Sequence, residues 1–282
     1  MTSITASKPF RFFVGLHKRE FTIHSALIAH QSPALDKLVS GEFAEAQKYE
    51  ATWESVDEQT FIRFVEYAYT GDYNEEEPKT LPESAVLDEP IATTADNSLK
   101  EDSPDEGTFQ LTRKKKKSKR SNIWGEDIAA TDPEPTKKER LWNEFKNTSY
   151  LDPNADSRAR EYKRSRKNKG AHEDHTEIFL SHARLYVFAD CYGISGLIGL
   201  SLHKLQQALI VFQLHPERVG DVVALLRYCY EDAVPDLLRS LVVQYTTCNI
   251  EVLWKSADFQ HLLASHAELS VVLVGSMLDR LE

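Results

Sequence analysis

Apolar residues recur with a clear period over two stretches of the chain, which are separated by about one hundred residues without any such period. The first stretch opens with the apolar segment Phe10–Val14 and continues with alternation over Glu20–Ile23, which predicts two strands joined by a polar turn. A third short strand is expected at Glu50–Ser55, with Trp53 as its bulky member. We therefore expect a hairpin and one further strand.

Two helices are predicted within the same stretch. Ser32 before Pro33 marks the first start, because a serine oxygen accepts an orphan backbone N–H and proline presets the first helical φ. We expect this helix to end at Gly41 in the left-handed conformation. Asp57 is expected to cap the second helix, which ends at Gly71. The buried stripe of that second helix comprises Phe61, Phe64, Val65 and Ala68.

Helical periodicity returns after His175 and continues to the C-terminus. Two helices are expected over Phe179–Gly193 and Ser195–Phe212. Further helices are expected after Pro216 and after Pro235, with a last one near the C-terminus. Their predicted buried stripes are Val219, Val222, Val223 and Leu226, then Leu237, Leu238, Leu241, Val242 and Tyr245, and finally Leu269, Val272, Leu273 and Met277.

The segment between the two stretches, residues 75–175, has a different composition. It carries 42 charged residues and only 16 large apolar ones. Such a segment buries too little apolar surface to offset the entropy lost on ordering, so we predict a disordered insertion. Within it, Leu141, Trp142 and Phe145 suggest one amphipathic helical turn that docks on a partner or on the folded part.

Composition adds limits to this picture. The chain has 282 residues, 41% of them apolar, which is typical of a globular protein with some disorder. We find neither a run of roughly 20 apolar residues nor a signal peptide, so we expect an intracellular protein without a membrane contact. Cys191, Cys229 and Cys248 are odd in number and lie in apolar helical patterns, which predicts buried reduced thiols.

No segment has the pattern of a catalytic site. The sequence contains neither a nucleophile elbow nor a phosphate-binding glycine-rich loop. The histidines and carboxylates of His172–His175, together with His182, are suitable metal ligands, but their spacing matches no closed site. We interpret residues 172–175 as the solvated end of a linker. We therefore expect no enzyme activity, no cofactor, no metal and no small-molecule substrate.

Four short segments carry a family resemblance: Phe21–His24, Ser32–Leu35, Gly41–Ala46 and Tyr67–Tyr73. Together they resemble the BTB/POZ domain, and Phe10–Gly15, Phe21–Leu27 and the long charged insertion are similar to the lineage-expanded BTB proteins of filamentous fungi. The resemblance implies an α+β fold with a small three-stranded sheet flanked by helices, which the insertion interrupts before its last two helices. The expected parts are residues 8–74 (first part of the BTB domain), 75–175 (disordered insertion), 176–212 (last two BTB helices) and 213–282 (helical extension).

The same resemblance implies a non-catalytic module that binds proteins. It would act as an adaptor or scaffold that either forms a homodimer or recruits a partner, for example a cullin ubiquitin ligase. Members that bind a cullin often have a hydrophobic, any, Glu triplet after the Ser-Pro helix; here Ser40 replaces the Glu, and Glu42 is the substitute. The residues expected to bind a partner are Leu38, Val39, Glu42, Phe43, Tyr69, Asp72 and Tyr73.

The alternative function depends on a basic run in the insertion, which has seven positive charges in eight residues. This density favours nuclear import or binding to nucleic acid or chromatin partners, against a linker balanced by its acidic flank. Phosphate attraction alone reads no bases, so sequence-specific DNA binding is not expected. We expect a nucleus-localised protein, and deletion of the run should abolish nuclear accumulation of a tagged chain. The run comprises Arg113, Lys114, Lys115, Lys116, Lys117, Lys119 and Arg120.

Overall fold

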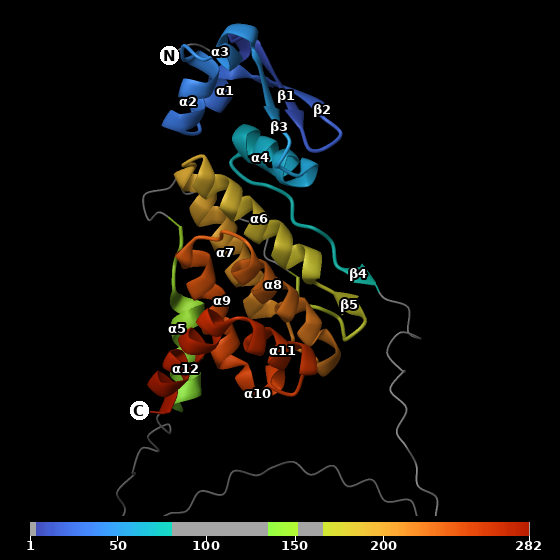
Figure 1. Ribbon diagram of the computed structural model, residues 1–282, viewed down its shortest axis with the longest axis vertical. Helices are drawn as coiled ribbons and strands as arrows, with labels where there is room; N and C mark the ends of the chain where they lie inside the picture. The colour runs from blue at the N-terminus through green and yellow to red at the C-terminus, as the bar shows by residue number, and fades with distance from the viewer. Residues whose placement is uncertain (1–3, 81–134, 152–165, 282) are drawn as a thin grey trace, which may run out of the picture. The chain divides into compact units, whose positions relative to one another are not determined.

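Strand β1 (Pro9–Val14) lies at the centre of a three-stranded sheet (Figure 1). It pairs antiparallel with β2 (Arg19–His24) and parallel with β3 (Glu50–Trp53). Alternate side chains of β1 are buried, as expected for a strand that covers a core with one face. The predicted hairpin and third strand are confirmed. This computed structural model describes residues 4–80, 135–151 and 166–281.

Short helices follow the hairpin and precede β3, and a longer one follows β3. The two predicted helix starts are confirmed, because Ser32 Oγ accepts from the backbone N–H of Leu35 at 3.1 Å and Asp57 Oδ1 accepts from that of Thr60 at 2.9 Å. Gly71 ends the longer helix with a φ of 80°, in the left-handed region. The elements are η1 (Ile4–Ala6), α1 (Ser25–Ala29), α2 (Pro33–Ser40), α3 (Ala44–Lys48) and α4 (Glu58–Thr70).

Gly41 ends α2, but the predicted left-handed stop is wrong. Its φ is −77° and its ψ is −167°, which is extended backbone open to most residues. Glycine is needed there for space, because a Cβ would lie 2.3 Å from the carbonyl oxygen of Lys37. The sequence signal for a glycine after a helix was therefore correct, although the physical reason is a close approach rather than a positive φ.

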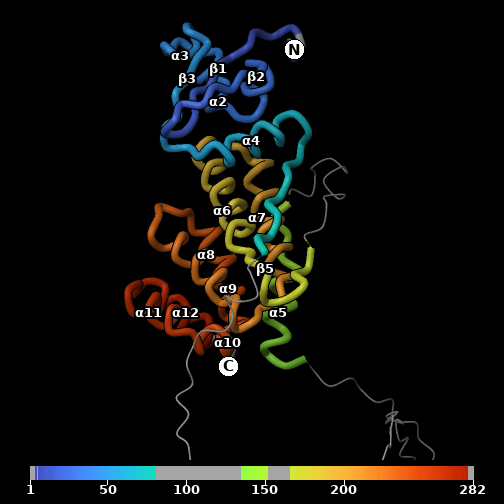
Figure 2. Tube along the Cα trace, turned by 90° about the vertical axis from the view of Figure 1, so that its right-hand side faces the viewer, coloured from blue at the N-terminus to red at the C-terminus, as the bar shows by residue number. Residues whose placement is uncertain are grey.

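Helices α6 (Thr176–Cys191) and α7 (Ser195–Val211) complete the core of the first stretch (Figure 2). They lie side by side, and α6 packs on α4. The rings of Phe64 and Phe188 lie 5.0 Å apart, and Trp53 stacks on Tyr192 at 4.5 Å. Two stretches separated by about one hundred residues thus share one hydrophobic interior, as predicted. The boundaries of the four expected parts stay predictions.

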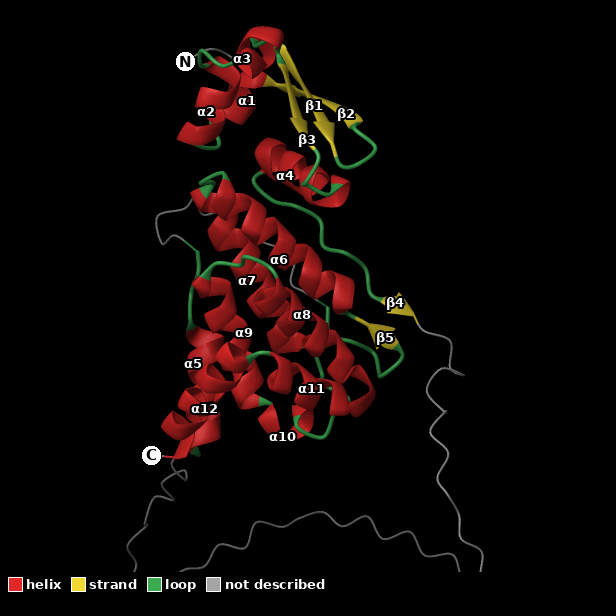
Figure 3. Cartoon of the chain, in the orientation of Figure 1, coloured by secondary structure: helices red, strands yellow, loops and turns green. Residues whose placement is uncertain are grey.

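A second core involves the other faces of α6 and α7 and the C-terminal helices (Figure 3). Leu237 and Val272 were predicted in the buried stripes but are exposed, because they lie at the polar edges of their helices. The thiol of Cys191 is also exposed, which corrects the prediction of three buried cysteines. The elements are η4 (Pro216–Arg218), α8 (Val219–Glu231), α9 (Asp236–Cys248), α10 (Ile250–Leu253), α11 (Ala257–Ser265) and α12 (Ala267–Leu281).

Helix α5 (Lys137–Asn147) belongs to this second core, although it lies within the segment predicted as a disordered insertion. Phe145 is 1% exposed and its ring lies 5.9 Å from that of Tyr245. The prediction that the whole of residues 75–175 is disordered is therefore too broad. The expectation that the amphipathic turn docks on the folded part is confirmed. Residues 81–134 and 152–165 lie outside the described ranges.

Among the described residues, no single helix is both long and apolar enough to cross a membrane. The helices α11 and α12 meet the length and composition criteria only as a pair, bent by 110°.

Candidate functional site

Exposed aromatic side chains mark the surface where partner-binding residues were predicted. Phe43 precedes α3 and is 61% exposed, and Tyr69 near the end of α4 is 51% exposed. The Tyr69 hydroxyl lies 3.0 Å from Nδ1 of His24, the last residue of β2, and this hydrogen bond holds the Tyr69 ring. Large aromatic side chains left in water are typical of interaction surfaces.

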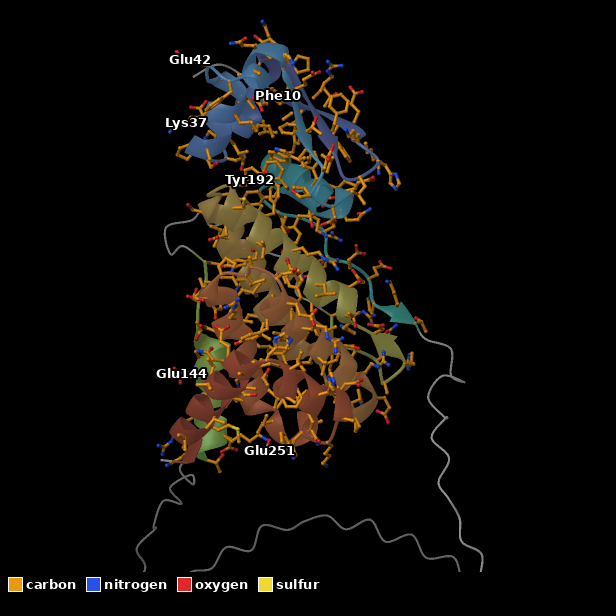
Figure 4. The ribbon with its side chains drawn as sticks, viewed as in Figure 1. Phe10, Lys37, Glu42, Glu144, Tyr192 and Glu251 are labelled. Atoms are coloured by element: carbon orange, nitrogen blue, oxygen red, sulfur yellow. The ribbon has the colours of Figure 1, made fainter. Side chains whose placement is uncertain are left out.

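Two further predicted residues come from α2 and from the turn after it. Leu38 on α2 is half-buried against the core, and Glu42 between α2 and α3 is exposed. Figure 4 shows Glu42 and Lys37 at the outer edge of α2 and α3, whereas Phe10 lies within the sheet. We call Leu38, Glu42, Phe43 and Tyr69 the α2–α4 surface.

The other three predicted partner-binding residues are placed differently. Val39 and Tyr73 are each only 4% exposed, so both belong to the core and offer no surface to a partner. Asp72 is half-buried and forms an ion pair with Lys204. The prediction fails for Val39 and Tyr73 because an apolar or aromatic residue type alone does not distinguish a core position from a binding position, and for Asp72 it stays a prediction.

Buried polar contacts join the segment after α4 to α7. The Lys204 ammonium donates to the carbonyl oxygen of Tyr73 at 2.6 Å and lies 2.6 Å from Asp72 Oδ1. It also lies 4.2 Å from the centre of the Tyr73 ring. Because Lys204 is only 3% exposed, these partners replace its hydration. We call the whole cluster the polar junction; it comprises Arg63, Asp72, Tyr73, Glu76, His182 and Lys204.

His182 contributes to the polar junction from α6. The Tyr73 hydroxyl and His182 Nδ1 lie 2.7 Å apart, in a fully buried position. Burial first, and then the positive charges of Lys204 and Arg63, lower the pKa of His182 to about 3, so its imidazole is neutral. Burial raises the pKa of Tyr73 well above its usual value. The Tyr73–His182 contact is therefore a bond between two uncharged groups, and Lys204 carries the positive charge beside it.

A cavity of about 680 Å³ lies beside the polar junction. One wall is the segment 72–80, which ends in β4 (Lys79–Thr80), and β4 pairs with β5 (Glu173–Asp174). The carboxylate of Glu173 accepts from Arg166 Nη2 at 3.0 Å and from the backbone N–H of Lys169 at 2.7 Å. Glu173 and His175 are both buried, so the prediction of a solvated linker end over residues 172–175 is wrong.

The other interpretation of residues 172–175, together with His182, was a metal-binding site. In the described ranges, no group of three or more His, Cys, Asp and Glu side chains is placed to hold a metal ion.

Asp221 on α8 is a buried carboxyl group that contacts this region, because its Oδ2 accepts from the backbone N–H of His175 at 2.9 Å. Arg218 Nη1 lies 3.8 Å from Asp221 Oδ1. Burial raises the pKa of Asp221 to about 6, since desolvation outweighs this hydrogen bond and the Arg218 charge. At pH 7 the fold therefore holds a buried carboxylate that it stabilises incompletely.

Asp221→Asn is expected to raise the free energy of unfolding by about 2 kcal/mol at pH 8 and by about 1 kcal/mol or less at pH 4.5. The folded-state pKa lies above the usual 3.8, so the stability that protonated Asp221 confers is complete below pH 3.8 and is lost as the pH rises through about 6. Asparagine keeps the acceptor for His175 without the charge. Urea denaturation at both pH values measures the effect, with the exposed Asp232→Asn as control. A variant less stable than the parent at pH 8 would contradict the argument.

The basic run Arg113–Arg120 lies outside the described residues. Its predicted role in nuclear import or polyanion binding therefore stays a prediction.

Sequence reasoning missed most of the polar junction. The partners Tyr73 and His182 are 109 positions apart, and Lys204 lies 131 positions after Tyr73. One signal was available in the sequence, because Lys204 interrupts an otherwise apolar helical stripe, and a lysine in a core position requires a carboxylate or carbonyl partner.

Comparison with known protein families gives one finding for this fold. Residues 12–88 match the family model of the BTB/POZ domain. The match begins in β1, includes β2, β3 and α1–α4, and ends beyond β4. It confirms the resemblance inferred from the sequence for this part of the chain. A search of curated proteins found no match to the chain.

Proposed function

Given that this chain contains a BTB/POZ domain, we propose that it is an adaptor that recruits a partner polypeptide through the α2–α4 surface. A BTB/POZ domain is typically a non-catalytic module that binds other proteins. The observation that supports this most directly is the solvent exposure of Phe43 and Tyr69 within that domain. Most other aromatic rings of the domain are buried in one hydrophobic core or pack against it. An exposed aromatic anchor beside an exposed carboxylate is the composition of an interaction surface.

The partner class that we propose is a cullin-type ubiquitin ligase scaffold. In this reading Leu38 and Phe43 supply apolar contacts, and Glu42 supplies the negative charge that Ser40 lacks. The Glu42 side chain is in water, while its carbonyl oxygen accepts from Gln47 Nε2 at 3.2 Å, so the backbone that presents the carboxylate is held locally. One hydrogen bond to a charged group contributes about 1.5–3 kcal/mol, so the replacement can preserve binding.

Phe43→Glu is expected to reduce recovery of a cullin with the tagged full-length chain by about tenfold or more. The substitution places a charge where an apolar anchor would be desolvated, and a central anchor typically contributes 2 kcal/mol or more. Affinity purification followed by immunoblotting measures the recovery. Leu16→Glu is the matched control, because Leu16 is 87% exposed in the turn between β1 and β2 and lies outside the α2–α4 surface.

Three outcomes separate the versions of this proposal. Loss of cullin with Phe43→Glu but not with Leu16→Glu supports it. Equal recovery with both variants removes the α2–α4 surface as the cullin contact. Recovery of only the chain itself removes the ligase role and leaves self-association, which light scattering then measures as a multiple of the 32.2 kDa chain mass.

A further inference from the structure

Helix α5 contacts the second core through one narrow face (Figure 1). Phe145 is the single buried residue of its eleven, and Trp142 beside it is half-buried. Figure 4 shows Glu144 on the outward side of the same helix. By contrast, the neighbouring helix α7 has nine buried residues. Helix α5 is therefore attached by one apolar stripe, in the way that a bound peptide helix is attached to its receptor.

The surface beneath α5 has two features that fit the end of a helix. The side-chain amide of Gln206 on α7, which is 1% exposed, donates to the carbonyl oxygens of Phe145 and Thr148 at 2.6 and 2.8 Å. Carbonyl oxygens at the end of a helix have no partner within the helix. Gly199, two turns earlier on α7, lies so close to the carbonyl oxygen of Tyr150 that a Cβ would be 2.6 Å away. Because apolar side chains would fill the same space, the buried amide and the glycine indicate a site shaped for a polypeptide backbone.

Charged and aromatic contacts hold the rest of α5. Lys138 Nζ lies 2.9 Å from Glu251 Oε2 on α10, and both side chains are about half exposed. The aromatic anchors follow, because the rings of Trp142 and Phe145 lie 6.2 and 5.9 Å from that of Tyr245 on α9. We call the surface that α5 covers the α5 site; it comprises Gly199, Gln206, Tyr245 and Glu251.

The chain connections of α5 are long enough for the helix to leave its site. Residues 81–134 before it and 152–165 after it lie outside the described ranges. The shorter connection has 14 residues, and a chain of that length can span up to about 50 Å. The contacts between α4 and α6, α6 and α8, and α8 and α9 do not involve α5. The capping box of Thr136 and Glu139 also allows the helix to begin without a neighbouring element.

We propose that the α5 site binds a helix of a partner protein in exchange for α5, which masks the site within the chain. The partner helix has the chemistry of α5 itself: a lysine in the first turn, two aromatic residues three positions apart and an extended aromatic residue after the last turn. A tethered helix has an effective concentration that is commonly millimolar, so the partner has to compete with it. Exchange of α5 between two copies of the chain would gain no contact, which favours a different protein as the partner. The proposal goes beyond the proposed function and does not rest on it, because it uses no residue of the α2–α4 surface.

A labelled synthetic peptide of residues 135–151 tests the proposal in place of the partner helix, and fluorescence anisotropy measures its binding to full-length chains. We expect at least tenfold tighter binding to the Phe145→Ala chain, whose own α5 has lost its anchor, than to the parent, where α5 competes. A peptide that itself carries Phe145→Ala should bind at least tenfold more weakly, whereas Lys146→Ala, at an exposed position, should leave peptide binding unchanged. Equal binding of the native peptide to the parent and to a folded Phe145→Ala chain, or binding to neither, would overturn the proposal.

Gln206→Leu tests whether the site recognises the end of the helix. In the Phe145→Ala background it should reduce the affinity for the peptide about tenfold, because the amide donates to two carbonyl oxygens. Gln207→Leu makes the same change one position along α7, about 100° around the helix, and is the matched control. Equal affinities of these two variants would overturn the site as placed here.

Proteolytic cleavage makes the test independent of whether the Phe145→Ala chain folds. Protease sites placed within residues 81–134 and 152–165 of the full-length chain release α5 from both connections without a change to any described side chain. We expect excess labelled peptide to replace the native fragment in size-exclusion chromatography, whereas the uncleaved parent should take up at least tenfold less label. A native fragment that stays bound without exchange would overturn the proposal and make α5 a fixed part of the second core. A parent dimer that the peptide converts to the 32.2 kDa chain would also overturn it, because α5 of a second copy would then occupy the site.

Discussion

Lys204→Met is expected to lower the free energy of unfolding by about 3 kcal/mol. The ammonium of Lys204 donates to the Tyr73 carbonyl oxygen and forms an ion pair with Asp72, and it does so from a buried position. Methionine keeps the length of the side chain but leaves that carbonyl oxygen without this donor. Breaking a buried pair by removal of one partner typically destabilises a protein by 3–5 kcal/mol, and the partial exposure of Asp72 places the expectation at the lower end.

Urea denaturation of the full-length chain measures this effect, and Lys138→Met is the control. Lys138 is also a lysine within 2.9 Å of a carboxylate, that of Glu251, but both side chains are about half exposed. Exposed pairs contribute between 0 and 1 kcal/mol, so the control should differ little from the parent. A loss below 1 kcal/mol for Lys204→Met would show that the polar junction does not contribute to joining the segment after α4 to α7.

Local signals predicted the elements of the first stretch well, because each depends on neighbours in sequence. Ser32 and Asp57 cap their helices as expected, and the alternation around Phe12 gives the central strand. The joining of α6 and α7 to this sheet followed from the family resemblance, since periodicity shows that a helix has an apolar face but does not show which element covers it.

The parts that could not be predicted depend on pairs far apart in sequence. The polar junction joins residues over more than one hundred positions, and no period or motif links Tyr73 to Lys204. In the same way, the exposure of Phe43 and the burial of Val39 follow from how α2 packs on the sheet, not from residue type. The sequence thus indicated the part of the chain in which candidate site residues lie, but not which of them are exposed or which distant residues they contact.

Helix α5 shows how composition over a long window concealed a short ordered element. The sequence Thr136-Lys137-Lys138-Glu139 is a capping box: Thr136 Oγ1 accepts from the Glu139 backbone N–H at 3.2 Å, and Glu139 Oε2 accepts from that of Thr136 at 2.7 Å. Gln206 on α7 then donates to the carbonyl oxygens of Phe145 and Thr148 at 2.6 and 2.8 Å. An average over about one hundred residues does not register eleven residues held by these contacts.

Phe145→Ala is accordingly expected to lower the free energy of unfolding by about 3–5 kcal/mol, the range for a fully buried phenylalanine. The truncation removes contacts with Trp142, whose ring lies 5.4 Å away, and with Tyr245. Lys146→Ala is the matched control, since Lys146 is exposed on the same helix and alanine is a better helix former. Urea denaturation compares the two. If Phe145→Ala were as stable as Lys146→Ala, α5 would be a dispensable part of the inserted segment; the expected difference instead makes it a part of the second core, supplied by a segment that composition alone assigns to disorder.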